Sequence, residues 1–217
     1  MLYKNRYLVF SIILIAGIFS SCNQHLDKAA VENIPQAIPV IINDSSTLSL
    51  DKSPMDMSYF PAEYPKQKMI TPDMNNLVAR VIYSRPQKNG RIIFADSSVK
   101  ENFIQHYGQE WRLGANEATE IEFFKDVIAG GKKISKGRYI IYCIPLTDKW
   151  KIIFNSNLFS WGLHMDKTKS IYEIELPVSI QNTEIEIFTM IFQKADHGCD
   201  LVMAWGNMKV IMPISFN

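Results

Sequence analysis

The stretch at residues 111–119, "WRLGANEAT", concentrates side chains that could bind a small polar molecule. Arg112 supplies a guanidinium for anionic or hydroxyl groups, and Asn116 and Glu117 supply groups that would fix the orientation of a ligand. Trp111 would stack against the ligand, and Thr119 closes the stretch with a hydroxyl. Such a mixture is typical of a pocket for a sugar or a carboxylate.

Strand alternation predicts how these side chains are positioned. If the first and third residues of "IEF" face a core, Thr119 and Glu117 continue the same inward line. The same alternation in "LVARVIYSR" places Arg85 inward at the end of its strand. Buried charges cannot stay unpaired without a large cost, so Glu117 is predicted to pair with Arg85 or Arg112.

This pattern has more than one interpretation. In the functional one, Arg85, Arg91 and the five residues named in the stretch surround a ligand. In the structural interpretation, they form a buried ion pair and a turn that begin a strand, and we prefer it because structural ion pairs are common.

A hydrolase acting on an envelope glycan, with Glu117 as acid or base, is a rival function. That rival requires a second carboxylate at roughly 5–9.5 Å, and a close arginine counts against it. A pure interaction subunit would instead expose an apolar patch. We assign no catalytic residue.

The sequence predicts no metal site, no cofactor and no nucleic-acid partner. Its four histidines form no HxH or HExxH pattern, and its formal net charge is +1. Cys143 and Cys199 are expected to be buried free thiols, although a disulfide is conceivable after export. Trp150, Trp161 and Trp205 could line an aromatic platform for a sugar, but packing in the core or at an edge is preferred.

The N-terminus is typical of an exported lipoprotein. Lys4 and Arg6 precede an apolar run at residues 8–19, and two serines lie directly before Cys22. The sequence "IFSSC" resembles the bacterial lipobox, which implies a signal peptide at residues 1–21 and a lipid on Cys22. An ordinary cleaved signal peptide is the less favoured alternative. We expect a protein anchored to the membrane of the bacterial cell envelope, on the periplasmic face or the cell surface.

Beyond a tether at residues 22–52, the chain predicts an all-β domain at residues 53–217. Short apolar or alternating segments, such as "RYIIYCI", "KWKIIFN" and "KVIMPISF", are separated by turn-forming residues. The pair Gly130-Gly131 predicts a two-residue hairpin turn. One short helix is predicted at residues 97–108, where Ser98 begins a capping box. We expect an antiparallel β-sandwich or flattened barrel of about eight to ten strands.

Several motifs resemble, in order, a bacterial family known as domain of unknown function 2911. They are "SPMDMSYFPAEYP", "ARVIYSRPQKNGRIIF", "WRLGANEATEIEF", "GGKKISKGRYIIYCIP", "KWKIIFN" and "WG". The resemblance runs from about Ser53 to the C-terminus and implies a mostly β domain without an established activity. Family motifs would fall on residues 84–86, on Gly90 and Arg91, and on residues 111–119. Many members resemble exported proteins or lipoproteins, especially in the Bacteroidota. The chain departs from the family pattern between Phe94 and Trp111, where a longer connection intervenes.

Overall fold

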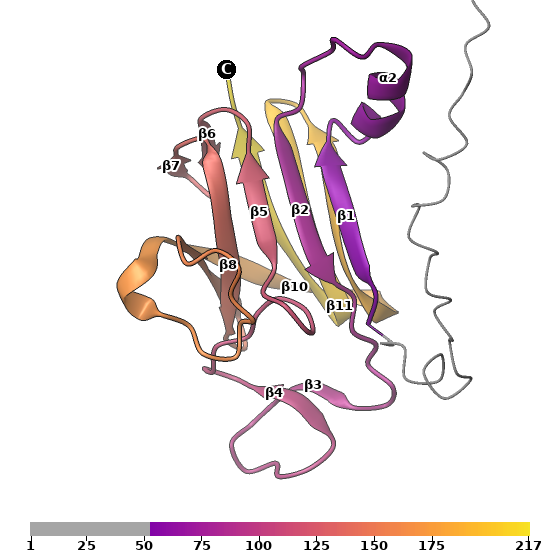
Figure 1. Ribbon diagram of the computed structural model, residues 1–217. Helices are drawn as coiled ribbons and strands as arrows, with labels where there is room; N and C mark the ends of the chain where they lie inside the picture. The colour runs from indigo at the N-terminus through magenta and orange to yellow at the C-terminus, as the bar shows by residue number, and fades with distance from the viewer. Residues whose placement is uncertain (1–52) are drawn as a thin grey trace, which may run out of the picture. The chain divides into compact units, whose positions relative to one another are not determined.

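A computed structural model describes residues 53–217, which form a domain whose regular elements are nearly all strands (Figure 1). The predicted signal peptide, Cys22 and the tether at residues 22–52 lie outside the described residues. The elements in chain order are β1 (Met55–Phe60), α2 (Tyr64–Ile70), β2 (Ala79–Ser84), β3 (Ile92–Ala95), β4 (Phe103–His106), β5 (Glu120–Phe123), β6 (Val127–Ala129), β7 (Lys132–Ile134), β8 (Gly137–Pro145), β9 (Lys149–Asn155), the 3-10 turn η2 (Lys167–Lys169), β10 (Ser170–Ala195) and β11 (Gly198–Ser215).

Nine of the strands form one antiparallel sheet in the order β1-β2-β5-β8-β9-β10-β11-β6-β7, and β3 pairs with β4 in parallel. The long hairpin of β10 and β11 bends within its length. Its register shifts on either side of Ile185, and Gly206 opposite adopts a positive φ of 57°. This bend folds the sheet over on itself, so β11 and part of β10 lie behind β1 and β2 in Figure 1. The predicted sandwich-like all-β fold is confirmed.

The bend returns the second half of β10 to the first two strands of the sheet. There, the backbone N–H of Met190 donates to the hydroxyl of Tyr83 over 2.9 Å, and that of Phe192 donates to the hydroxyl of Ser58 over 3.0 Å. A strand edge with unpaired N–H groups would be costly or would recruit another strand. Side-chain hydroxyl groups of β1 and β2 therefore accept hydrogen bonds from these N–H groups of β10, in place of a continuous ladder between paired strands.

An aromatic cluster centred on Trp111 fills one part of the core. The indole of Trp111 stacks on that of Trp205, with ring centroids 5.6 Å apart. It also makes edge contacts with Phe94, Trp150 and Phe188 at centroid distances of 5.3, 5.7 and 5.0 Å. Such tilted and offset pairs add stabilisation beyond the burial of apolar area. Trp150 and Trp205 are therefore core residues, in agreement with the prediction.

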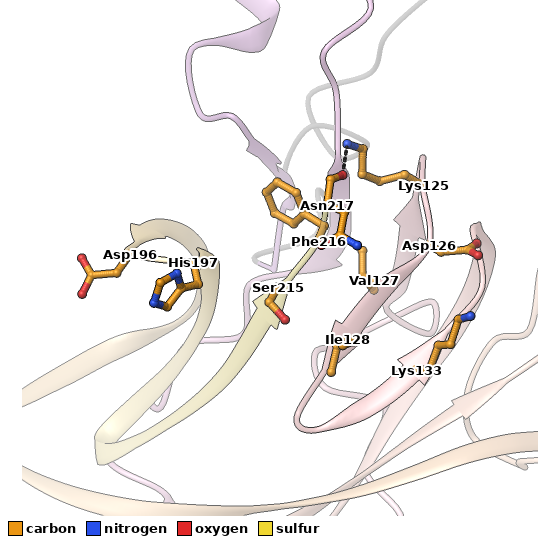
Figure 2. A pocket seen from close by; sticks show the side chains of 10 residues that line it. All are labelled: Lys125, Asp126, Val127, Ile128, Lys133, Asp196, His197, Ser215, Phe216 and Asn217. Carbon is orange, nitrogen blue, oxygen red and sulfur yellow. Dashed lines mark hydrogen bonds between the residues drawn. The ribbon is translucent and has the colours of Figure 1, made fainter.

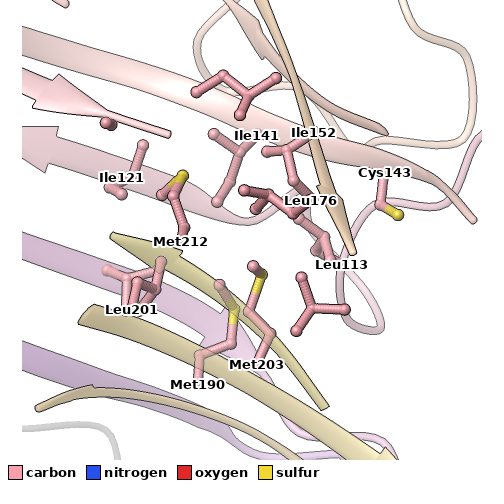
Figure 3. Packing of buried hydrophobic residues seen from close by; sticks show 14 of the residues in the cluster. Leu113, Ile121, Ile141, Cys143, Ile152, Leu176, Met190, Leu201, Met203 and Met212 are labelled. Atoms are coloured by element: carbon pink, nitrogen blue, oxygen red, sulfur yellow. The ribbon is translucent and has the colours of Figure 1, made fainter. Parts of the chain in front are cut away.

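A second part of the core consists of aliphatic and methionine side chains that meet between the two halves of the folded sheet. Figure 3 shows residues from β5, β8, β9 and β10 packed with residues from the β10–β11 hairpin, among them Ile121, Ile141, Ile152, Leu176, Met190, Leu201, Met203 and Met212. Cys143 and Cys199 lie in the same core as free thiols, which confirms the prediction for them.

The strand alternation read from the sequence is confirmed in the central strands. Val81 and Tyr83 of β2 and Ile121 and Phe123 of β5 are all buried. Val127, which opens β6, is buried too. The predicted turn at Gly130-Gly131 joins β6 and β7, with both glycines at positive φ (52° and 82°) as a tight hairpin turn requires.

The helix predicted at residues 97–108 is wrong. Its second half is β4, and its first half is a turn in which the N–H of Ser98 donates to the carboxylate of Asp96 over 2.9 Å. Asn102 then takes a φ of 56°, which a helix cannot contain. The apparent capping serine thus belongs to an Asx-type turn, since Asp96 satisfies the N–H group that a helix would leave open.

The single α-helix of the described residues, α2, was not predicted and begins within the motif "SPMDMSYFPAEYP". It has a proline in its first turn and buries none of its residues. The same segment also contains β1, which pairs with β2 along its whole length. A helix without a buried face shows no apolar periodicity, and so the sequence pattern gave no signal for it.

The outer face of the sheet carries cross-strand ion pairs. Five glutamates take part, and each of them meets a cation on a neighbouring strand or loop. The pairs are Arg80–Glu122, Arg138–Glu120, Lys149–Glu175, Lys151–Glu173 and Lys88–Glu184. These carboxylates are therefore part of a solvated, charge-matched surface.

Candidate functional site: an arginine-lined cleft

The stretch at residues 111–119 is a loop tied at both ends. Trp111 and Cys143 exchange two backbone hydrogen bonds of 2.7 Å. At the other end, the hydroxyl of Thr119 donates to the carbonyl of Leu113 over 2.7 Å, and the Thr119 N–H donates to the carbonyl of Arg112 over 3.3 Å. Thr119 is thus fully buried and fixes the loop. Its polar atom serves the backbone and is not presented to a ligand.

Trp111 belongs to the core and not to a binding surface. Only 5% of the residue is exposed, and its indole N–H donates to the carbonyl of Gly114 over 3.2 Å. Gly114 in turn lies so close to β2 that an added Cβ would be 2.9 Å from the carbonyl oxygen of Ser84. The expectation that Trp111 stacks on a ligand is therefore not supported, because its ring is buried among other aromatic rings.

The predicted burial of Glu117 is wrong, since its side chain is exposed. Strand β5 begins only at Glu120, and Leu113 and Asn116 have positive φ values of 54° and 59°. Left-handed residues break the two-residue period, so alternation counted back from β5 fails beyond Thr119. The acid–base role considered for Glu117 loses the burial on which it depended.

Arg85 does not pair with Glu117 either. Its guanidinium lies 3.3 Å from the carboxylate of Asp56 and donates to Thr189 Oγ1 over 3.3 Å. Tyr83 lies near this ion pair, and its burial is the main cause that raises its pKa above the ordinary value of 10.0. Arg85 therefore joins β1, β2 and β10, and this structural role places it apart from the residues that line the cleft.

A cleft of about 320 Å³ does lie against the loop, and three of the seven predicted ligand-binding residues line it: Arg91, Trp111 and Arg112. Its other lining residues are Ser53, Pro86, Ile104, Gln105, Glu110, Gly114, Ala115, Gly162 and Leu163. Arg85, Asn116, Glu117 and Thr119 do not line it. Asn116 instead donates to the carbonyl of Ser53 over 3.4 Å and so holds one wall.

The two arginines of the cleft make hydrogen bonds to backbone carbonyls. Arg91 donates to Lys88 over 3.1 Å and to Gln87 over 2.7 Å, and Arg112 donates to Trp161 over 3.3 Å. Among the described residues, neither arginine lies within 4.0 Å of a carboxylate. Each guanidinium has five N–H donors, so both retain donors for an added acceptor.

Arg112 is partly buried, and this burial disfavours the charged form of its guanidinium. Desolvation lowers the pKa of this guanidinium below its ordinary value of 12.5, and the charge of nearby Glu117 opposes the shift. The group still carries its charge at neutral pH. A charge that is partly removed from water, and that has no carboxylate of the described residues within 4.0 Å, gains more from an anionic ligand than a fully solvated one would.

The segment at residues 156–163 forms the rim of this cleft. The N–H of Ala118 donates to the carbonyl of Ser160 over 3.1 Å, and the hydroxyl of Ser160 accepts the N–H of Gly162 over 3.1 Å. Gly162 and Leu163 line the cleft, and the exposed Trp161 lies between Gly162 and Ser160. These rim residues lie far from Arg112 in the sequence, and only the composition "FSWGL" could have suggested them.

Comparison with known families shows a match to the family model described as "protein of unknown function (DUF2911)" over residues 65–214. The chain belongs to this family. The match confirms the resemblance seen in the sequence motifs and includes most of the segments that line the cleft. No curated protein and no solved structure matched the chain.

This DUF2911 domain also has a larger cavity, of about 860 Å³, where β6, the β10–β11 turn and the last residues of the chain meet. Figure 2 shows Lys125 and Asp126 on one side and Asp196 and His197 on the other. Lys125 already donates to the carbonyl of Asn217 over 2.9 Å. The charges of this cavity are of both signs and widely spread, so they define no single ligand chemistry.

Two features are absent from the described residues 53–217 of the DUF2911 domain. No group of three or more His, Cys, Asp or Glu side chains in this part is arranged to hold a metal ion. None of its helices is long and apolar enough to cross a membrane. The arginine-lined cleft is thus the site where the sequence motif and the structure coincide.

Proposed function

We propose that this DUF2911 protein is a lipid-anchored lipoprotein of the bacterial cell envelope whose β-sandwich binds a small polar ligand in the arginine-lined cleft. The anchor is supported by the apolar run at residues 8–19 and by the lipobox-like "IFSSC" that ends at Cys22. We place the domain on the periplasmic face or the cell surface, with residues 22–52 as its tether.

The observation that carries the binding proposal is that no carboxylate of residues 53–217 pairs with Arg91 or Arg112. The other arginines of the described residues, Arg80, Arg85 and Arg138, all form ion pairs. Planar guanidinium groups recognise carboxylates through paired hydrogen bonds, each stronger than a neutral one. Two such groups in one cleft therefore favour an anionic ligand, with hydroxyl groups as additional acceptors.

The hydrolase alternative has less support. Its acid–base residue, Glu117, is exposed and does not line the cleft. The carboxylate that does line the cleft, Glu110, is held by Lys167 at 2.8 Å. A glycosidase needs two carboxylates placed on either side of the bond to be cleaved. The cleft therefore favours binding over hydrolysis.

The anchor is tested by replacing Cys22 in cells that express the full chain. We expect wild type to incorporate a labelled fatty acid and to fractionate with membranes. Cys22→Ser should lose the label and appear in a soluble fraction, because several acyl chains provide the anchoring energy. Fatty-acid labelling that persists in Cys22→Ser would contradict the proposal.

Binding is tested by calorimetric titration of the purified full chain in detergent with glutarate, a small dicarboxylate. We expect Arg112→Ala to weaken binding by about 10- to 100-fold, the usual effect of losing a charged hydrogen bond. Arg80→Ala is the matched control, because Arg80 is paired with Glu122 on the sheet face. Equal affinities of wild type and Arg112→Ala for glutarate, or no binding at all, would reject the cleft as an anion site.

A further inference from the structure

Trp161 differs from the other three tryptophans of the chain. Its exposed fraction is 54%, whereas those of Trp111, Trp150 and Trp205 are 5%, 0% and 0%. A large apolar ring that remains in water is costly and often marks a contact surface. Leu163, two residues further and also exposed, lines the cleft. Trp161 itself is not one of the lining residues, so the two side chains form an exposed apolar edge beside the arginine-lined cleft.

The backbone fixes Trp161 beside the arginine. Arg112 donates to the carbonyl of Trp161 over 3.3 Å, so the backbone of Trp161 lies against the guanidinium. Gly162 follows with a φ of 80°, and an added Cβ would be only 2.9 Å from the Cβ atoms of Arg112 and Ala118. At Gly162 the rim lies so close to the loop at residues 111–119 that only a glycine fits without a clash. Trp161 therefore belongs to an ordered turn.

From this arrangement we infer that the ligand of the cleft is a carboxylated sugar, of the uronic acid type. Arg91 and Arg112 bind the carboxylate, and the indole of Trp161 packs against the apolar face of the pyranose ring. Aromatic rings suit this task because they offer a flat apolar surface of low conformational entropy. This inference rests on the proposed function and names its ligand class.

The charges of the cleft agree with an acidic sugar. Glu110, the one carboxylate among the lining residues, is paired with Lys167 at 2.8 Å, so it does not neutralise the two arginines. The volume of about 320 Å³ is at the lower end of the range for small-molecule sites. It suits one sugar residue, such as the end of a chain, better than a long oligosaccharide.

The test compares three probes that separate the two recognition elements. D-glucuronate has ring and carboxylate, D-glucose has the ring alone, and glutarate has carboxylates without a ring. Each is titrated into the purified full chain and followed by calorimetry. Tryptophan fluorescence adds a local signal, because Trp161 is the one tryptophan with substantial exposure. We expect D-glucuronate to bind most tightly and to shield Trp161 from a soluble quencher.

Two variants then separate the inference from the proposed function. Trp161→Ala should weaken D-glucuronate by about tenfold and leave glutarate unchanged, whereas Arg112→Ala should weaken both. Trp161→Phe should retain most of the D-glucuronate affinity, since it keeps an aromatic face. Thermal denaturation of each variant verifies that it is folded.

The opposing outcomes are distinct. If glutarate and D-glucuronate bind equally and Trp161→Ala changes neither, the anion site stands and the sugar assignment is wrong. If D-glucose binds as tightly as D-glucuronate, the ligand is a neutral sugar and the inference also fails. If no probe binds, the proposed function fails together with the inference.

Discussion

The outer sheet face and the cleft both carry arginines, but they differ in what neutralises them. On the sheet, Arg80 pairs with Glu122 and Arg138 pairs with Glu120. In the cleft, Arg91 and Arg112 bond to backbone carbonyls and have no carboxylate within ion-pair distance in the described part of the chain. Arginine side chains are therefore neutralised by glutamates on the sheet face, whereas those in the cleft remain available to a ligand.

Strand register explains this difference. Arg80 lies directly opposite Glu122 in the pairing of β2 with β5, so the sheet itself brings the opposite charges together. The two arginines of the cleft lie in loops, where no ladder of paired strands places a carboxylate opposite them. An unpaired charge in such a place is retained at some cost, which is reasonable when a ligand supplies the counter-charge.

The largest effect should come from the wall behind the cleft. Trp111→Ala removes the centre of the aromatic cluster and should lower the free energy of unfolding by about 3–5 kcal/mol, as core truncations of this size do. Trp161→Ala is the control and should change it by less than about 0.5 kcal/mol, because its ring is exposed. Chemical denaturation measures both. Similar small costs for the two would show that Trp111 belongs to the site and not to the core.

A smaller effect is expected at Gly162 of the rim, and Gly131 of the β6–β7 turn is its control because the two have similar φ values in different surroundings. Gly162 has a φ of 80° with neighbours at 2.9 Å, and Gly131 has a φ of 82° with nothing within 4 Å. Gly131→Ala should cost about 1 kcal/mol for the left-handed conformation alone. Gly162→Ala should cost about 2–3 kcal/mol, because the clash adds to that strain. Equal unfolding free energies would mean that the rim is loosely packed.

The direct comparison of the two regions uses one arginine from each. Arg80→Ala should lower the free energy of unfolding by about 1 kcal/mol, since it breaks a half-buried pair with Glu122. Arg112→Ala should change the free energy of unfolding by less than about 0.5 kcal/mol while weakening ligand binding. Denaturation with and without added salt provides the measurement. A cost for Arg112→Ala as large as that for Arg80→Ala would assign Arg112 to folding.

The smallest effect at neutral pH concerns the thiols of the core. Burial raises the pKa of Cys143, and burial together with the charge of Asp200 raises that of Cys199 from 9.0 to about 12. Both thiols should therefore resist alkylation at pH 8 until the protein is denatured, with labelled peptides identified by mass spectrometry.

The same shift predicts how stability depends on alkaline pH. The folded state holds the Cys199 proton where the unfolded state has lost it. This contribution to stability is complete below pH 9.0 and is lost as pH rises from 9.0 towards about 12. Cys199→Ala should reduce that slope in a series of denaturation curves. Rapid alkylation of either thiol in the native protein would show that the core behind the cleft opens readily.

Particular residues show where sequence reasoning worked and where it failed. Ile121 and Phe123 face the core as alternation predicted, because β5 is a regular strand. The same count fails at Glu117, since left-handed residues intervene. The predicted helix failed because the capping signal at Ser98 serves an Asx-type turn in this chain. Local patterns hold only within a regular element, and loops follow contacts that are distant in sequence.

The sequence by itself determined the strand-rich fold, its inward faces, the hairpin at Gly130-Gly131 and the family to which the chain belongs. It also indicated the stretch at residues 111–119, because the types of its side chains are visible without coordinates. Only the tertiary structure decided that Trp111 is core, that Arg112 borders a cleft and that Trp161 forms its rim. Side-chain alternation is encoded locally, whereas a cleft depends on which distant loops the folded sheet brings into contact.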